Sequence, residues 1–248
     1  MKNVVRLFFV VGFSFITSCI PDSFEVDNKM ISETFSLLPI YEPSGLSYSP
    51  NKDFLYTVSD RGMIYKIDFE GNKLDQLPYT DEDFEGVTVN PATSNIYVVK
   101  ERTGELVELT AKGKVIKAYP IIGDSGNSGL EGATYDSKHD IFYLLKEKTP
   151  GLLITYSLKD GKIREKQLGF ALDYSGIYYN KATGNLWITS QESHTLYKCT
   201  TLGKVIEKFA IPIYSIEGIV VNDDETEAYI VSDKDNSLYK IDLTIYLQ

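Results

Sequence analysis

The chain has 248 residues and a formal net charge of −10 at pH 7, with 24% charged and 12% aromatic residues. An acidic balance of this size disfavours binding to nucleic acid or to an anionic lipid surface and permits binding of cations. The length is ordinary for one all-β domain with a large core, and two cysteines cannot supply a framework of disulfides.

The N-terminal segment has the pattern of a secretion signal. Two basic residues, Lys2 and Arg6, precede an apolar run over residues 7–16 and a few small residues before Cys19. The run is too short to cross a membrane as a helix. The four residues ITSC that end at Cys19 resemble the lipobox of bacterial lipoproteins, in which the cysteine becomes the lipidated first residue of the mature chain.

The lipobox resemblance divides the chain into a signal peptide (1–18), a lipid-anchored tether (19–26) and one domain (27–248). It implies a protein of the bacterial cell envelope, held to a membrane through a lipid on Cys19, on the periplasmic or outer-membrane side. The alternative is an ordinary signal peptide with a chance cysteine. If Cys19 is lipidated, Cys199 has no disulfide partner, and we expect it to be a packed thiol.

A repeat runs through the rest of the chain. Each copy begins with a glycine and an alternating strand, continues through a turn rich in Asn, Asp and Pro, and enters a second strand with an aromatic residue at a fixed position. A repeat of about 40 to 45 residues is typical of the four-stranded blade of a β-propeller. The five repeat glycines, called marker glycines below, are Gly45, Gly86, Gly132, Gly176 and Gly218.

A third strand and, after a glycine turn, a fourth follow in the first four copies, but the fifth copy ends after its third strand. Residues 29–40 have the character of the missing outer strand. The sequence therefore predicts an all-β, five-bladed propeller of four-stranded antiparallel blades, with the N-terminal strand completing the last blade and closing the ring. We expect this single domain to be monomeric.

Two sets of residues are predicted to lie around one mouth of the central channel. The first strand of each blade lines the channel, and the antiparallel second strand returns to the level where the first began. The residues that precede the marker glycines are Ser44, Glu85, Glu131, Ser175 and Glu217. The residues at the ends of the second strands are Asp60, Glu101, Glu147, Gln191 and Asp233.

Crowded carboxylates repel one another unless a cation or a basic partner compensates, and a site made of oxygen ligands suits Ca²⁺. We therefore predict metal binding by Glu85, Glu131 and Glu217, with Asp60, Glu101, Glu147 and Asp233 as a secondary ring. The fourth blade lacks acids at both positions, so any site should be lopsided and open toward that blade.

The alternative to metal binding by the secondary ring is a structural role. Its acids could accept hydrogen bonds from backbone amides of a neighbouring blade. In four blades the next residue is basic and could neutralise the acid: Arg61, Arg102, Lys148 and Lys234.

Signals for catalysis are thin. The chain has no nucleophile elbow, no HExxH motif and no phosphate-binding glycine loop. The two histidines, His139 and His194, fall in a turn and just beyond a strand, without a serine or cysteine at a recognisable spacing. No catalytic residue is predicted.

Four repeat openings, EPSGLSYSP, DFEGVTVNP, GLEGATYD and SIEGIVVN, with the later SDR, KER, KEK and SDK, resemble the SdiA-regulated family of bacterial envelope β-propellers. The resemblance implies a secreted, often lipid-anchored propeller with a link to calcium and no established enzymatic activity. Short Glu-Gly openings also occur in gluconolactonases and paraoxonases, where a glutamate at the channel mouth ligates calcium. Their further ligands and catalytic acid or histidine have no counterpart that we can place here.

The sequence thus supports two leading functions. The first is a non-enzymatic binding or scaffolding module with a Ca²⁺ or small-ligand site at the acidic channel mouth, whose partner is a small ligand or an envelope protein. The alternative is a calcium-dependent hydrolase acting on a phosphoester or lactone at the same mouth. In a third arrangement, paired side chains plug the channel and a loop face contacts another protein.

Overall fold

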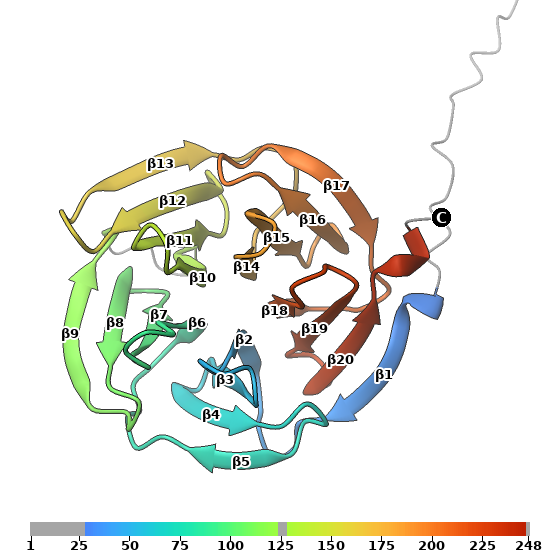
Figure 1. Ribbon diagram of the computed structural model, residues 1–248, viewed down its shortest axis with the longest axis horizontal. Coiled ribbons are helices and arrows are strands. Elements are labelled where there is room, and N and C mark those ends of the chain that lie inside the picture. The colour runs from blue at the N-terminus through green and yellow to red at the C-terminus, as the bar shows by residue number, and fades with distance from the viewer. Residues whose placement is uncertain (1–27, 124–127, 247–248) are drawn as a thin grey trace, which may run out of the picture.

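The structure is a computed structural model, and it describes residues 28–123 and 128–246. Five four-stranded sheets form the blades of a closed ring around a central channel (Figure 1). This confirms the predicted five-bladed all-β propeller. The predicted signal peptide, the predicted tether and Cys19 lie outside the described residues. Within the described ranges, no helix has the length and apolar character needed to cross a membrane.

The first four blades are each built from four consecutive antiparallel strands, counted from the channel outward. Blade one has β2 (Pro43–Tyr48), β3 (Leu55–Ser59), β4 (Met63–Ile67) and β5 (Lys73–Gln76). Blade two has β6 (Phe84–Val89), β7 (Ile96–Lys100), β8 (Glu105–Leu109) and β9 (Val115–Pro120). Blade three has β10 (Leu130–Asp136), β11 (Ile141–Lys146), β12 (Leu152–Ser157) and β13 (Ile163–Gln167). Blade four has β14 (Ile177–Asn180), β15 (Asn185–Ser190), β16 (Thr195–Cys199) and β17 (Val205–Ala210).

Blade five combines the two ends of the described chain. Its inner strands are β18 (Ile216–Val221), β19 (Glu227–Ser232) and β20 (Ser237–Asp242), and its outer strand is β1 (Ile31–Ser36). The strand β1 runs antiparallel to β20, with Phe35 opposite Leu238. Short 3₁₀ turns flank this pair, η1 (Asn28–Met30) and η2 (Thr244–Tyr246). The N-terminal strand therefore closes the ring, as predicted.

Apolar side chains fill the spaces between neighbouring blades, with one buried cluster at each of the five contacts. The aromatic residue of each second strand belongs to these clusters: Trp187 is 1% exposed and Tyr97 is 1% exposed. Cys199 is also fully buried here, and burial raises the pKa of its thiol to about 12. A protonated, inaccessible thiol is not a nucleophile, in agreement with the expected packed cysteine.

The marker glycines are explained by close contact between the backbones of adjacent blades. A Cβ atom at Gly86 would lie 2.7 Å from the carbonyl oxygen of Glu131, and one at Gly176 would lie 2.0 Å from that of Glu217. In blade two, the register between β6 and β7 shifts around Gly86, as in a β-bulge. At this level the channel narrows to a space of about 10 Å³, which is roughly the space that one water molecule needs. We call this level the glycine waist.

Candidate functional site

A cavity of about 190 Å³ opens on one side of the glycine waist, and we call it the acidic mouth. Both predicted sets of residues line it, so all seven predicted acids come together there. Their role as metal ligands stays a prediction. The lining residues are Glu42, Ser44, Asp60, Glu85, Glu101, Glu131, Glu147, Asp173, Ser175, Gln191, Glu217 and Asp233.

The structure adds a third set of acids that the sequence analysis missed. These residues stand three positions before the marker glycines, and in three blades they are acidic: Glu42, Asp83 and Asp173. The backbone explains their position, because the N–H of Asp60 donates to the carbonyl of Glu42 at 3.0 Å and the N–H of Glu101 to that of Asp83 at 3.1 Å. Extending the repeat register by three residues would have found them.

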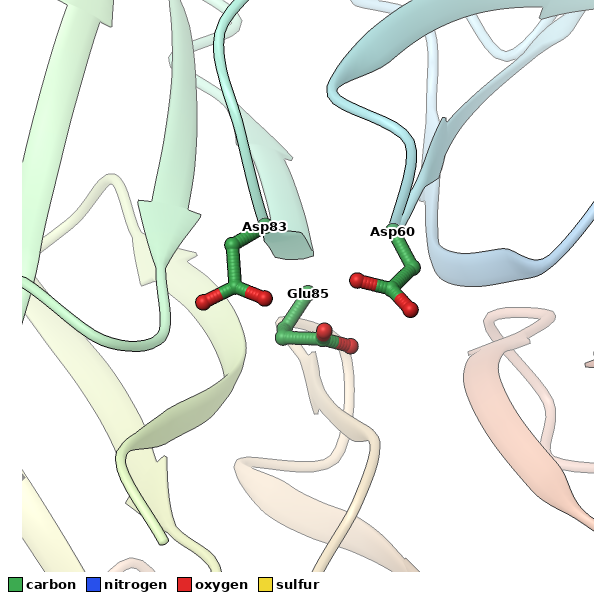
Figure 2. A group of neighbouring side chains, drawn as sticks. All are labelled: Asp60, Asp83 and Glu85. Atoms are coloured by element: carbon green, nitrogen blue, oxygen red, sulfur yellow. The ribbon is translucent and has the colours of Figure 1, made fainter. Parts of the chain in front are cut away.

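Three carboxylates form a compact group between blades one and two. The groups of Asp60, Asp83 and Glu85 each offer an oxygen, and these oxygens all lie within 4.8 Å of one another. Figure 2 shows the two aspartates on either side of Glu85. One base touches this group: the Nε of Arg102 lies 3.3 Å from Asp83 Oδ2. The main-chain N–H of Arg102 donates to the same oxygen at 3.0 Å.

A second group lies between blades three and four and consists of Glu147, Asp173 and Glu192. Sequence reasoning expected the fourth blade to be poor in acids, because Ser175 and Gln191 replace acids of the two predicted rings. Asp173 lines the mouth on this side, and Glu192 lies next to it in the second group. The mouth is therefore acidic on the side of blade four as well.

The basic residues that follow the secondary ring have different contacts from blade to blade. The Nε of Arg61 pairs with Glu42 at 2.6 Å, and Lys234 lies over the ring of Tyr214 at 4.3 Å. The structural reading of the ring fits Glu101, whose Oε1 accepts a hydrogen bond from the N–H of Gly129 at 3.3 Å, at the start of the next blade.

Burial and mutual repulsion favour the protonated forms of the inner glutamates. Burial is the largest cause that raises the pKa of Glu85, Glu131 and Glu217 well above the ordinary value of 4.5. Neighbouring carboxylates add to it: Asp60 acts most strongly on Glu85, and Glu85 on both other glutamates. A compensating cation would favour the ionised forms of these acids.

These shifts predict the pH dependence of stability. An acid whose pKa is raised in the folded state binds more protons there than in the unfolded chain, so its contribution is fully present below 4.5 and is lost as pH rises through the folded pKa. We expect the melting temperature of the metal-free protein to fall as the pH rises above about 4.5, the ordinary pKa of these acids, and to fall less steeply in Glu217→Gln. Thermal melts at fixed ionic strength test this, and equal slopes in both proteins would contradict it.

A second cavity, of about 270 Å³, opens on the other side of the glycine waist. Four tyrosines lie in its wall, and the rings of two of them, Tyr48 and Tyr178, meet edge to face with centroids 6.0 Å apart. Burial raises the pKa of both phenols, which therefore stay protonated. The sequence analysis did not find this cavity, because aromatic residues in these strands also read as ordinary strand formers.

The profile of the family described as SdiA-regulated matches residues 30–242. The chain belongs to the SdiA-regulated family. The match covers every strand of this SdiA-regulated propeller, from β1 to β20, and it confirms the resemblance carried by the repeat openings.

Solved structures similar to this SdiA-regulated protein are distant in sequence. A nidogen/laminin complex has 14% identity and a TM-score of 0.62, and the match covers 84% of this chain and 78% of that one. A streptogramin B lyase has 17% identity and a TM-score of 0.53, with coverage of 85% and 72%. Virginiamycin B lyase from Staphylococcus aureus has 16% identity and a TM-score of 0.52, with coverage of 81% and 66%. At these identities the likeness shows the propeller fold alone.

Proposed function

We propose that this protein is a non-enzymatic binding or scaffolding module of the bacterial cell envelope whose acidic mouth binds a hard divalent cation, Ca²⁺ first. One observation carries the proposal: Asp60, Asp83 and Glu85 present oxygens within 4.8 Å of one another, inside a mouth lined by further acids. Ca²⁺ takes six to eight oxygens at about 2.3–2.6 Å, and two ligands of one ion can be about 5 Å apart.

The donor set also favours Ca²⁺ over other common ions. The lining of the mouth contains carboxylates, serine hydroxyls and one amide, without a histidine or cysteine among the residues described there. Such oxygen ligands suit Ca²⁺ and Mg²⁺, whereas Zn²⁺ favours nitrogen and sulfur. Mg²⁺ demands near-ideal octahedral geometry and gives up water reluctantly, so a wide mouth with many carboxylates suits the larger ion.

Calorimetric titration of the metal-stripped domain with CaCl₂ tests the proposal. We expect stoichiometric binding, weakened at least about tenfold in Glu85→Gln, which corresponds to a loss of about 1.4 kcal/mol of binding free energy. Glu165→Gln is the matched control, because Glu165 is exposed on the outer strand β13 and should leave binding unchanged. The same titration of Glu131→Gln and Glu217→Gln tests the rest of the predicted trio. Absence of binding by the native domain would refute the calcium proposal.

The membrane anchor is part of the same proposal and rests on the signal-like segment that ends at Cys19. Lipidation of Cys19 would hold the propeller at a membrane of the envelope, through the short tether (19–26) that precedes the domain. In Cys19→Ala we expect the protein to be lost from the washed membrane fraction and to incorporate no labelled fatty acid. Cys199→Ala is the control for labelling. Unlabelled native protein would exclude the anchor.

One observation favours the alternative function, a calcium-dependent hydrolase. Burial and neighbouring acids keep the pKa of Glu131 well above its ordinary value, as in carboxyl groups that transfer protons during catalysis. Calcium-loaded protein should then hydrolyse chromogenic phosphoesters or lactones, and Glu131→Gln should abolish turnover while the calcium affinity changes little. Turnover that persists in Glu131→Gln would rule out this role for Glu131.

A further inference from the structure

The group between blades three and four already contains a positive charge from the chain itself. The Nζ of Lys148 lies 2.6 Å from Glu147 Oε1 and 3.0 Å from Glu192 Oε1. Glu147 follows the second strand of blade three, and Glu192 follows the second strand of blade four. Lys148 thus bridges two blades in the position that a bound cation would take.

The third acid of this group, Asp173, has only one of its two carboxylate oxygens satisfied by hydrogen bonds. Asp173 is 0% exposed, and its Oδ1 accepts hydrogen bonds from the hydroxyl of Ser190 and from the N–H of Glu192, the latter at 3.0 Å. Its Oδ2 is buried and has no hydrogen-bond partner among the described residues. A buried carboxylate oxygen without a donor or cation is costly, so this atom points to a missing ligand.

We propose that Glu147, Asp173 and Glu192 form a second divalent-cation site, in which the Lys148 ammonium stands in for the ion. The choice of a divalent cation as the ligand rests on the proposed function. A divalent ion carries twice the charge of the ammonium and can contact Asp173 Oδ2 together with the two glutamates. The Lys148 side chain is 37% exposed, so its flexible stem can withdraw into solvent as the ion enters.

In each acidic group a basic residue of the chain competes with a cation for the carboxylates, and the two groups differ in the strength of this competition. Arg102 touches one acid of the first group, Asp83, and its side chain is 60% exposed. Lys148 touches two of the three acids in the second group, Glu147 and Glu192. Displacing Lys148 therefore opposes binding at the second site. The native protein should bind one ion tightly and a second one more weakly.

Substitution of Lys148 by methionine tests this inference, because it removes the charge and keeps an unbranched side chain. Calorimetric titration with CaCl₂ should show the second ion bound at least about tenfold more tightly in Lys148→Met than in the native domain. Lys159→Met is the control, since Lys159 is an exposed residue of a turn and should leave both sites unchanged. Adding Asp173→Asn or Glu192→Gln to Lys148→Met should remove the gained affinity.

The outcomes separate this inference from the proposed function. One ion in the native domain and one in Lys148→Met, with unchanged affinity, would overturn the second site and leave the first. No ion in the native domain and one in Lys148→Met would support the second site and refute the first. No ion in either protein would overturn both. Glu192 is half-exposed, so Glu192→Gln keeps the test decisive if Asp173→Asn fails to fold, as judged by circular dichroism.

Discussion

Gly176→Ala is expected to destabilise the propeller by about 3 kcal/mol or more, or to prevent folding. The added Cβ would lie 2.0 Å from the carbonyl oxygen of Glu217 in the next blade and 2.8 Å from the hydroxyl oxygen of Thr189. The nearest obstacle is backbone, so relief requires two blades to move apart. Urea unfolding followed by circular dichroism measures the change.

Gly169→Ala is the matched control for this prediction. A Cβ atom at Gly169 would meet no atom within 4 Å, and this glycine has no positive φ that a side chain would strain. We expect its effect to stay within about 0.5 kcal/mol. Similar losses in Gly176→Ala and Gly169→Ala would show that close packing at the glycine waist does not govern stability.

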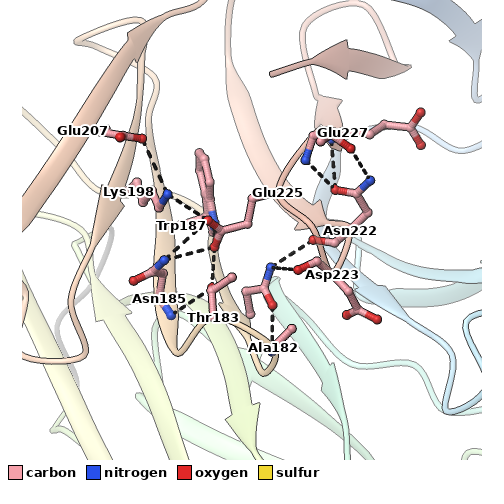
Figure 3. A network of polar contacts seen from close by, with 12 residues as sticks. Ala182, Thr183, Asn185, Trp187, Lys198, Glu207, Asn222, Asp223, Glu225 and Glu227 are labelled. Carbon is pink, nitrogen blue, oxygen red and sulfur yellow. Dashed lines mark hydrogen bonds and ion pairs between the residues drawn. The ribbon is translucent and has the colours of Figure 1, made fainter. Parts of the chain in front are cut away.

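Glu225→Ala should have the second large effect, a loss of about 3–5 kcal/mol in the free energy of unfolding. Glu225 is 8% exposed, in the turn between β18 and β19, and it reaches from blade five into blade four (Figure 3). Its carboxylate accepts hydrogen bonds from the Nε1 of Trp187 at 3.0 Å and from the hydroxyl of Thr183, and it pairs with the Nζ of Lys198 at 2.8 Å. Removing it leaves these donors without their shared acceptor.

Glu207→Ala provides the comparison, because Glu207 pairs with the same Lys198 from a more exposed position. Its distance to Lys198 Nζ is 3.6 Å and its side chain is 42% exposed, so a loss of at most about 1 kcal/mol is expected. Chemical denaturation of both variants, of Lys198→Met and of the two corresponding double variants measures the two couplings. If Glu207→Ala costs as much as Glu225→Ala, burial is not what makes Glu225 important.

The repeat made most of the fold predictable. Once one blade is recognised, its register transfers to the others, and the incomplete fifth copy demands a strand from residues 29–40. The same register placed Glu85 and Asp60 at one mouth, because strand direction alone decides which ends meet. The glycines marked the repeat, but their reason lies in contact between blades, which the sequence of a single blade does not contain.

Contacts between blades were harder to predict. Lys148 meets Glu192 and Glu225 meets Thr183, and each pair joins residues at the same position of two neighbouring repeats that differ in residue type from blade to blade. Asp173 was missed because the residues before the inner strands vary from blade to blade. A symmetric pattern predicts the scaffold, whereas the candidate sites depend on the departures from symmetry.

The pairing of β1 with β20 also constrains how the protein reaches its folded state. The first of the described strands completes a blade whose other three strands come last among them, so Ile31 meets Ile241 only after the four intervening blades have been synthesised. Such long-range pairing slows folding, and until it forms, β20 exposes an unpaired edge that can recruit another chain. The strand nearest the proposed tether therefore also closes the ring. A force applied through the tether would act directly on the pairing of β1 with β20.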